Sequence, residues 1–298
     1  MAPKFKTICL LGKLSDPAVT AILEAVLELL RARKLHIIAP QGTAELVNAA
    51  DIEVCPESAL CGRADLALIV GGDGTMLNAA RLFAPHAVPM VGINAGRLGF
   101  LADIPHNQVE QSLNDVLSGK FSEEKRFLLA GRVERGGKTI DTGAALNDVV
   151  LQKRDGGRMI EFESLVNGNY VCAHRADGIV VASPTGSTAY ALSAGGPILQ
   201  PVLDAIALVP ICPHTLSDRP IVIDGDSEVT LVLKGSALTR GQVVFDGQQT
   251  VDLEVGDRLH VKRGSECITL LHPSDHDYFK ILRNKLHWGR NHENNIDR

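Results

Sequence analysis

The strongest chemical signal in the sequence is a carboxylate set among glycines, in the run Val70-Gly71-Gly72-Asp73-Gly74-Thr75. An apolar stretch ends at the first glycine and a helical pattern follows the run, which predicts a strand, a turn and a helix. Glycines at such a turn let phosphate oxygens approach backbone N–H groups, and the helix N-terminus adds positive potential. The carboxylate of Asp73 would repel phosphate, but it could accept a proton from a hydroxyl group or help to hold Mg²⁺. The alternative is a tight turn in which Asp73 caps the helix.

Residues 177–197 form a second run, dense in Gly, Ser and Thr, between a strand-like segment and a short helical stretch. Such a run offers many hydroxyl and backbone donors in little space, which suits the phosphates and sugars of a nucleotide. The alternative is a solvated loop, although such loops rarely mix Tyr, Leu and Pro in this way. Asn147 and Asp148 stand at the start of another strand, where they could bind ribose hydroxyls or simply form a turn.

The first 120 residues supply the elements that position the glycine run. Apolar runs predict strands, and Asp16-Pro17 marks the start of a helix. The strands are expected at residues 7–12, 35–40, 64–70 and 88–94, with further helices near 75–84 and 106–118. This alternation predicts a parallel sheet covered by helices.

After Lys120 the pattern changes to short β-like runs punctuated by Gly and Asp, which predicts a sandwich-like β domain. The turns are expected at Gly136-Gly137, Asp155-Gly156-Gly157, Asp224-Gly225-Asp226 and Asp246-Gly247. The fold class is therefore an α/β N-terminal domain with a parallel sheet plus a β-rich, sandwich-like C-terminal domain. We expect an α/β domain over 1–122, a β-rich domain over 123–274, and a helical tail over 275–298 that packs back on the first domain.

Composition narrows the function. The 298 residues suffice for about two domains, and 30 basic against 35 acidic residues argue against broad binding of nucleic acid. No apolar run approaches the ~20 residues of a membrane span, and no signal peptide is evident, so a cytoplasmic location and no membrane partner are expected. Six scattered cysteines form no CxxC pair, which disfavours a zinc cage or a disulfide framework. His174 is interpreted as structural, and the spacing of His272, His276, His287 and His292 favours a solvated tail over a metal site.

These motifs together resemble a known family. The run from Gly71 to Thr75 looks like the signature of the superfamily of NAD kinases, lipid kinases and 6-phosphofructokinases. The segments 146–150, 177–197, 94–101 and 245–248 look like NAD kinases specifically, and residues 272–288 resemble the proteobacterial branch. The resemblance covers nearly the whole chain.

The resemblance implies phosphorylation of the adenosine ribose 2′-hydroxyl of NAD by ATP, which yields NADP. It makes Asp73 the general base and assigns the ATP phosphates to Gly71, Gly72, Gly74 and Thr75, with a divalent metal, Mg²⁺, to spread the charge. It implies a homodimer or homotetramer. The residues that it assigns to NAD are Asp73, Gly74, Asn147, Asp148, Arg158, Arg175, Asp177, Thr188, Ala189, Tyr190, Ala191, Leu192, Ser193 and Gln248. Many members carry Asn-Glu where this chain has Asn147-Asp148, and Arg158 follows a glycine loop.

Two other functions stay open at this point. A lipid kinase of the same superfamily would be expected to show an apolar cleft or basic patches, which a net charge of −5 and 4% aromatic residues do not favour. A catalytically silent, NAD-responsive regulator would be favoured by loss of Asp73, which is present. No covalent intermediate is expected, because Ser187 and Ser193 lack any sign of a His partner and the motif G-x-S-x-G is absent.

Overall fold

The computed structural model describes residues 5–14, 16–96, 99–154, 158–236 and 238–288. Its chain forms two compact units, residues 1–125 with 268–298, and residues 126–267. The boundary between residues 267 and 268 lies within the strand of residues 258–273, so no turn in the sequence marks it. Among the described residues, every helix is too short or too polar to cross a lipid bilayer.

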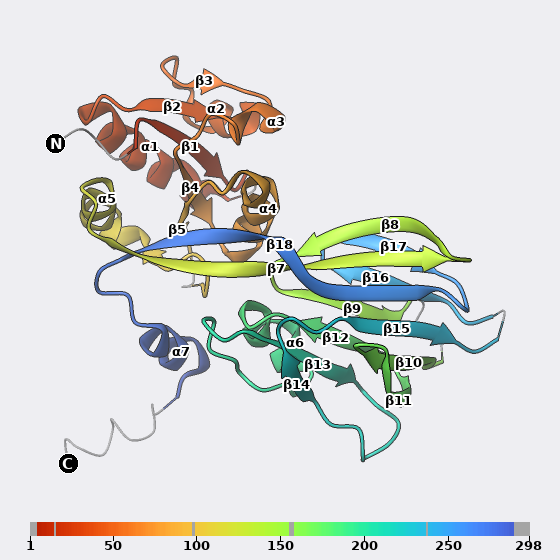
Figure 1. Cartoon of the computed structure of the whole chain (residues 1–298). Coiled ribbons are helices and arrows are strands. Elements are labelled where there is room, and N and C mark those ends of the chain that lie inside the picture. The colour runs from red at the N-terminus through yellow and green to blue at the C-terminus, as the bar shows by residue number, and fades with distance from the viewer. Residues whose placement is uncertain (1–4, 15, 97–98, 155–157, 237, 289–298) are drawn as a thin grey trace, which may run out of the picture. The chain divides into compact units, whose positions relative to one another are not determined.

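The first unit is built on a parallel sheet in the order β5-β4-β1-β2-β3, with β6 beside β5 (Figure 1). Its strands are β1 (Thr7–Gly12), β2 (His36–Ala39), β3 (Glu53–Val54), β4 (Leu66–Gly71), β5 (Met90–Asn94) and β6 (Ile104–Pro105). Every residue of β4 and β5 is buried, as befits parallel strands that are covered on both faces. The parallel sheet predicted from the apolar runs is confirmed.

Helices cover this sheet. α1 (Pro17–Ala32) begins where the sequence predicts, because Asp16 accepts the N–H of Ala18 and Pro17 stands at the first turn. Apolar side chains of α1 and α5 (Val109–Leu117) join those of β1 and β4 in one core. The remaining helices are α2 (Gln41–Val47), α3 (Glu57–Leu60), α4 (Asp73–Phe83) and the 3₁₀ turns η1 (Ala84–His86) and η2 (His106–Gln108).

The C-terminal segment returns to the first unit. β18 (Arg258–Pro273) pairs in parallel with β5 through Leu270 and Met90. α7 (Tyr278–Leu286) follows, and Asp277 caps it by accepting the N–H groups of Phe279 and Lys280. The helix predicted within the tail is thus present, while residues 289–298 lie outside the described part of the chain.

The second unit contains two antiparallel layers of strands. One has the order β14-β13-β12-β9-β16-β17, and its strands are β14 (Ile221–Asp224), β13 (Ala205–Ile211), β12 (Gly178–Ala182), β9 (Asp148–Lys153), β16 (Gly241–Phe245) and β17 (Gln249–Leu253). The other comprises β11 (Asn169–Ala176), β10 (Ile160–Val166), β15 (Val229–Lys234), β18, β7 (Phe121–Arg135) and β8 (Lys138–Ala145). One hydrophobic core contains side chains of both layers, so the sandwich-like domain is confirmed.

Two of the predicted turns close hairpins. Gly136-Gly137 joins β7 to β8 and Asp246-Gly247 joins β16 to β17, each with positive φ at both central residues. The turn at residues 224–226 instead joins β14 and β15, which pair with different neighbours. The turn predicted at residues 155–157 lies outside the described residues.

Candidate nucleotide site

The glycine run forms the strand, turn and helix that the sequence predicts. β4 ends at Gly71, Gly72 is the N-cap, and Asp73 opens α4. Asp73 therefore lies at the carboxyl end of a buried parallel strand and at a helix N-terminus, where ligands of α/β folds bind.

The loop of residues 99–102 holds the carboxylate of Asp73. Oδ2 accepts the N–H of Phe100 at 3.0 Å, and Oδ1 accepts those of Leu101 at 3.0 Å and Ala102 at 3.3 Å. A Cβ on Gly99 would lie 2.1 Å from Oδ1, so this residue must be glycine for the loop to approach. The carboxylate is thus fixed by backbone donors of another loop. The alternative interpretation, in which Asp73 only caps its own helix, does not account for these contacts. Arg97 and Leu98, part of the same sequence motif, lie outside the described residues.

The three glycines of the run differ in what surrounds them. A Cβ on Gly71 would lie 2.5 Å from Oγ1 of Thr75, so the fold itself needs glycine there. A Cβ on Gly72 or Gly74 would meet no protein atom within 4 Å. Packing within the chain therefore explains the first glycine but neither of the other two.

A cavity of about 530 Å³ lies within the first unit, beside this turn. Thr75 and Asn78 line it from α4, Lys13 from the end of β1, and Thr43 from α2. The ammonium, hydroxyls and amide suit a phosphorylated ligand, whereas the carboxylate of Glu57, which also lines the cavity, opposes one. Sequence reasoning singled out Thr75 but missed Lys13 and Thr43; Lys13 directly follows the glycine that ends β1, a position that could have revealed it.

The second unit has its own cavity of about 530 Å³. Asn147, Asp148, Ala189 and Tyr190, all expected from the sequence, line it. The sequence reasoning missed its floor, where neighbouring strands pair Val150 with Val244 and Gln152 with Gln242. Asp246, Gly247 and Thr250 complete the lining. The spacing of two residues along β9 and β16 is the signal that could have found the floor.

Asp246 organises the start of β9. Its carboxylate accepts the N–H groups of Leu146 at 2.8 Å, Asn147 at 2.8 Å and Asp148 at 3.2 Å. Asp148 itself is 5% exposed. Burial, and then the negative charge of Asp246, raise the pKa of the Asp148 carboxyl to about 7. An acid that is partly protonated at neutral pH can both donate and accept hydrogen bonds, which suits a hydroxyl-bearing ligand.

Several hydroxyls of the Gly/Ser/Thr run donate hydrogen bonds to carbonyls of the chain itself. Ser183 is fully buried and donates to the carbonyl of Leu146, and Ser187 donates to that of Pro184. Thr188 donates to the carbonyl of Thr185 at 3.3 Å. These groups fix the shape of η3 (Thr185–Thr188) and of the start of α6 (Tyr190–Ser193).

The remaining predicted NAD residues are scattered through the unit. Asp177 forms an ion pair of 2.8 Å with Lys153, and both line a smaller cavity of about 250 Å³ with Tyr190. Ala191 is buried, Leu192 is half-buried and Ser193 is exposed. Arg158, Arg175 and Gln248 are exposed and lie outside the described lining of the cavity that contains Asn147 and Asp148; Gly156 and Gly157 before Arg158 are not described.

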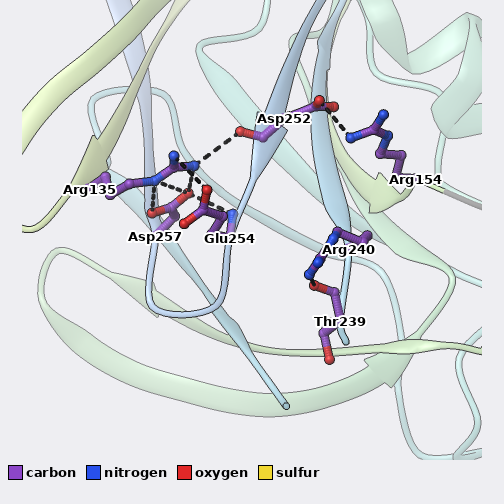
Figure 2. A network of polar contacts seen from close by, with 7 residues as sticks. All are labelled: Arg135, Arg154, Thr239, Arg240, Asp252, Glu254 and Asp257. Carbon is purple, nitrogen blue, oxygen red and sulfur yellow. Dashed lines mark hydrogen bonds and ion pairs between the residues drawn. The ribbon is translucent and has the colours of Figure 1, made fainter. Parts of the chain in front are cut away.

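A further cavity of about 590 Å³ in this unit has three arginines, Arg135, Arg154 and Arg240, on its wall. Acidic groups neutralise two of them: Arg135 contacts Asp257 and Glu254, and Arg154 contacts Asp252 (Figure 2). Arg240 donates to the carbonyl of Thr239. The cavity is therefore balanced in charge and is not a strong anion site.

The histidines of the C-terminal segment correct the sequence interpretation. The solvated tail is wrong for His272, which is 2% exposed. Nδ1 of His272 and Nδ1 of His276 each lie 2.7 Å from Oδ2 of Asp103. His287 is exposed, and His292 lies outside the described residues. His174 is structural as expected, since it contacts Ser164 and Asp218 and stacks on Phe162.

Comparison with known proteins gives the family. The model of the ATP-NAD kinase N-terminal domain matches residues 10–121, and that of the ATP-NAD kinase C-terminal domain matches residues 146–272. The chain is 47% identical to an NAD kinase of Nitrosospira multiformis over 97% of each chain, and 47% identical to one of Nitrosococcus oceani over 97% of this chain and 99% of that one.

Solved structures agree in fold. Yeast NADH kinase complexed with NADH has a TM-score of 0.88 at 23% identity, with 97% of this chain and 89% of the other covered. An NAD kinase from Archaeoglobus fulgidus in complex with ATP has a TM-score of 0.72 at 24% identity, with 93% and 99% covered. With both domain models matched and relatives at 47% identity over nearly the whole length, this chain belongs to the NAD kinase family.

Proposed function

We propose that the protein transfers the terminal phosphoryl group of ATP to the 2′-hydroxyl of the adenosine ribose of NAD, which yields NADP and ADP. The observation that carries this proposal is the carboxylate of Asp73 at the end of β4, held by backbone N–H groups beside two glycines that packing does not require. Membership of the family sets aside the lipid-kinase alternative.

The phosphates of ATP are assigned to the turn that opens α4. The space around the Cα atoms of Gly72 and Gly74 holds no protein atom that a side chain would meet, so phosphate oxygens can approach the backbone there, and the helix N-terminus attracts negative charge. Lys13 and Thr75, which line the adjacent cavity, supply a cation and a hydroxyl. Phosphoryl transfer depends mainly on positioning and charge neutralisation, and these groups provide both.

Asp73 is assigned to the hydroxyl that receives the phosphoryl group. Each carboxylate oxygen has two lone pairs, so Oδ2, which accepts the N–H of Phe100, can accept a further hydrogen bond. A sugar hydroxyl is far less acidic than a carboxylic acid, so Asp73 orients the hydroxyl first and takes its proton late in the transfer.

Asp73 would hold a divalent cation, Mg²⁺, together with the phosphates of ATP. A carboxylate is a ligand of the type that Mg²⁺ prefers, and Mg²⁺ usually binds proteins through one or two carboxylates together with phosphates. The donor set thus fits the ion, whose role when bound is to spread the charge of the triphosphate.

NAD is assigned to the cavity of the second unit that Asn147 and Asp148 line. Asn147 and Asp148 offer an amide and an acid for ribose hydroxyls and the carboxamide, and Tyr190 offers a ring. Asp177, Arg158, Arg175, Gln248 and residues 188–193 complete the proposed NAD-binding set. The residues on the cavity floor, Gln152 and Gln242, join it as further hydrogen-bond partners.

We further propose that the protein acts as a homodimer or homotetramer in the cytoplasm. The β-rich unit has strands β14 and β11 with free edges among the described residues, and edges of this kind favour association. Sedimentation at micromolar concentration tests the assembly, because particles of one 31.9 kDa chain would contradict it.

The activity is tested by incubation of the pure, folded protein with ATP, Mg²⁺ and NAD⁺, with NADP⁺ detected by an NADP⁺-specific dehydrogenase. We expect formation of NADP⁺ in proportion to enzyme. Binding of NAD⁺ without any NADP⁺ would overturn the proposal in favour of a silent NAD-responsive regulator.

A further inference from the structure

The loop of residues 99–102 fixes Asp73, yet its own support comes from elsewhere in the first unit. Its N–H groups at residues 100–102 bind the Asp73 carboxylate, and Gly99 donates its N–H to the carbonyl of Ala102, which closes a tight turn. The next residue in the chain is Asp103, whose side chain is 4% exposed. Whatever fixes Asp103 therefore fixes the donors that hold Asp73.

Two imidazoles fix Asp103. His272 at the end of β18 and His276 in the turn before α7 both direct Nδ1 at Oδ2 of Asp103, each at 2.7 Å. Their rings stack with centroids 3.9 Å apart, so the two donors approach the same oxygen side by side. On its other side, Nε2 of His272 lies 3.2 Å from Oε2 of Glu124.

Charge strengthens this arrangement. Burial disfavours the imidazolium form of His272, but its contacts with Asp103 and Glu124 outweigh burial and raise its pKa to about 9. Burial also opposes ionisation of Asp103, but the hydrogen bonds from His272 and His276 lower the pKa of that carboxyl to about 2. At neutral pH an imidazolium therefore lies between two carboxylates in a buried site, where a hydrogen bond between charged groups is strong.

A second contact joins the same C-terminal segment to the loop. Nζ of Lys285 in α7 lies 5.5 Å from the centroid of the Phe100 ring. Phe100 is the residue whose N–H binds Oδ2 of Asp73. Cation–π contacts of this kind contribute modestly, but this one acts on the loop independently of Asp103.

We infer that Asp103, with His272 and His276, is a positioning device for phosphoryl transfer: it ties the C-terminal segment to the loop that orients Asp73. The inference rests on the proposed role of Asp73. Among the described residues, the hydrogen bonds to Asp73 come from the backbone of residues 100–102 and those of the two histidines go to Asp103, so the three side chains act through that backbone. Displacement of a reacting group by about 1 Å can lower a rate about 100-fold, which sets the scale of the effect.

The first test follows the loop itself, by hydrogen exchange of the amides of residues 100–102 in the full-length protein. Asp103→Asn should speed their exchange about tenfold or more relative to wild type, as should His276→Gln, a milder change at a residue whose side chain is 15% exposed. The matched control is Asp257→Asn, which removes an equally buried carboxylate from its ion pair with the half-buried Arg135 in the other unit (Figure 2). Equal exchange at residues 100–102 in all these proteins would overturn the inference, whether or not the protein is a kinase.

The second test separates positioning from loss of stability. Asp103→Asn should lower kcat for NADP⁺ formation by about 10–100-fold, with both KM values within about threefold, whereas Asp257→Asn should leave kcat within about twofold. In a protein that already carries Asp73→Asn, adding Asp103→Asn should lower kcat by less than about a further twofold, because the carboxylate that Asp103 positions has been removed. Full additivity of the two substitutions would contradict the inference. If Asp73→Asn alone leaves kcat unchanged, the proposed function of Asp73 fails instead.

Discussion

Oδ1 of Asp246 accepts the backbone N–H of Asp148 at 3.2 Å, so that two carboxyl groups separated by 98 residues line one cavity. The turn that carries Asp246 thereby sets the start of β9, and its charge helps to keep the neighbouring acid partly protonated at neutral pH. The same pattern, a carboxylate bound by consecutive backbone N–H groups, recurs at Asp73 in the other unit.

Asp148→Asn should stabilise the protein in the absence of nucleotide. The pKa of Asp148 is raised from 3.8 to about 7, so the free energy of unfolding that its neutral form contributes is present below pH 4 and is lost as the pH rises through 7. Asparagine does not ionise, and the gain at pH 8 should be on the order of 3 kcal/mol or less. Denaturant unfolding at pH 5 and pH 8 measures this; a gain that is equal at both pH values would contradict the assignment.

Asp148→Ala should separate the two substrates. Loss of its hydrogen bonds to ribose should lower kcat/KM for NAD⁺ by about 5–150-fold, or roughly 1–3 kcal/mol, while KM for ATP changes little. A two-substrate kinetic matrix gives both values, with Asp257→Asn, whose carboxylate pairs with Arg135 away from this cavity, as a comparison. If KM for ATP rises as much as KM for NAD⁺, the acid belongs with the phosphates instead.

Substitution by alanine should lower stability at Gly71 but impair the use of ATP at Gly72 and Gly74. Gly71→Ala forces a Cβ to 2.5 Å from Oγ1 of Thr75 and should lower the melting temperature by several degrees. Gly72→Ala and Gly74→Ala meet no protein atom and should keep the melting temperature, but they should raise KM for ATP. Thermal unfolding together with ATP kinetics checks both halves, and normal use of ATP by the Gly72 and Gly74 variants would remove the phosphates from this turn.

Asp73→Asn should keep the fold and the binding of NAD⁺ but lose most turnover. Asparagine can still accept some of the N–H groups of the 99–102 loop, but it cannot take a proton, and general-base groups contribute about 10²–10⁴-fold. Steady-state kinetics and NAD⁺ binding by calorimetry test this pair of outcomes. A kcat within about threefold of wild type would remove Asp73 from the role of base.

Stability should also depend on pH through His272. The pKa of His272 is raised from 6.5 to about 9, so its contribution is fully present below pH 6.5 and is lost as the pH rises through 9. The change amounts to on the order of 3 kcal/mol. Wild type should therefore lose stability between pH 7 and 10 more steeply than His272→Gln. Urea unfolding at several pH values measures this for both proteins. If their free energies of unfolding change with pH in parallel, His272 is not charged in the native state.

The sequence predicts the parts of the fold that local patterns encode. The buried strands of the first unit, the Asp16 cap and the Asp-Gly hairpin each carry a local signal, and each is present. α2 and α3 went unpredicted because each is short and follows a proline without a side-chain cap.

The site shows the same division. Asp73 was found because its glycines mark it, but the loop that holds it acts through backbone N–H groups, which every residue except proline carries. Asp246 looked like a turn residue because its partners, residues 146–148, lie about a hundred positions earlier. His272 looked solvated because Asp103 is remote in sequence.

The first unit is assembled from residues 1–125 and 268–298, and this has a consequence for folding during synthesis. The second unit is continuous and can fold as soon as it leaves the ribosome, whereas the first must wait until β18 and α7 have emerged. At about 5–20 residues per second, Asp103 remains without His272 and His276 for roughly ten seconds or more after it is made. The nascent chain should therefore hold its nucleotide turn open to proteases and chaperones until translation is nearly complete.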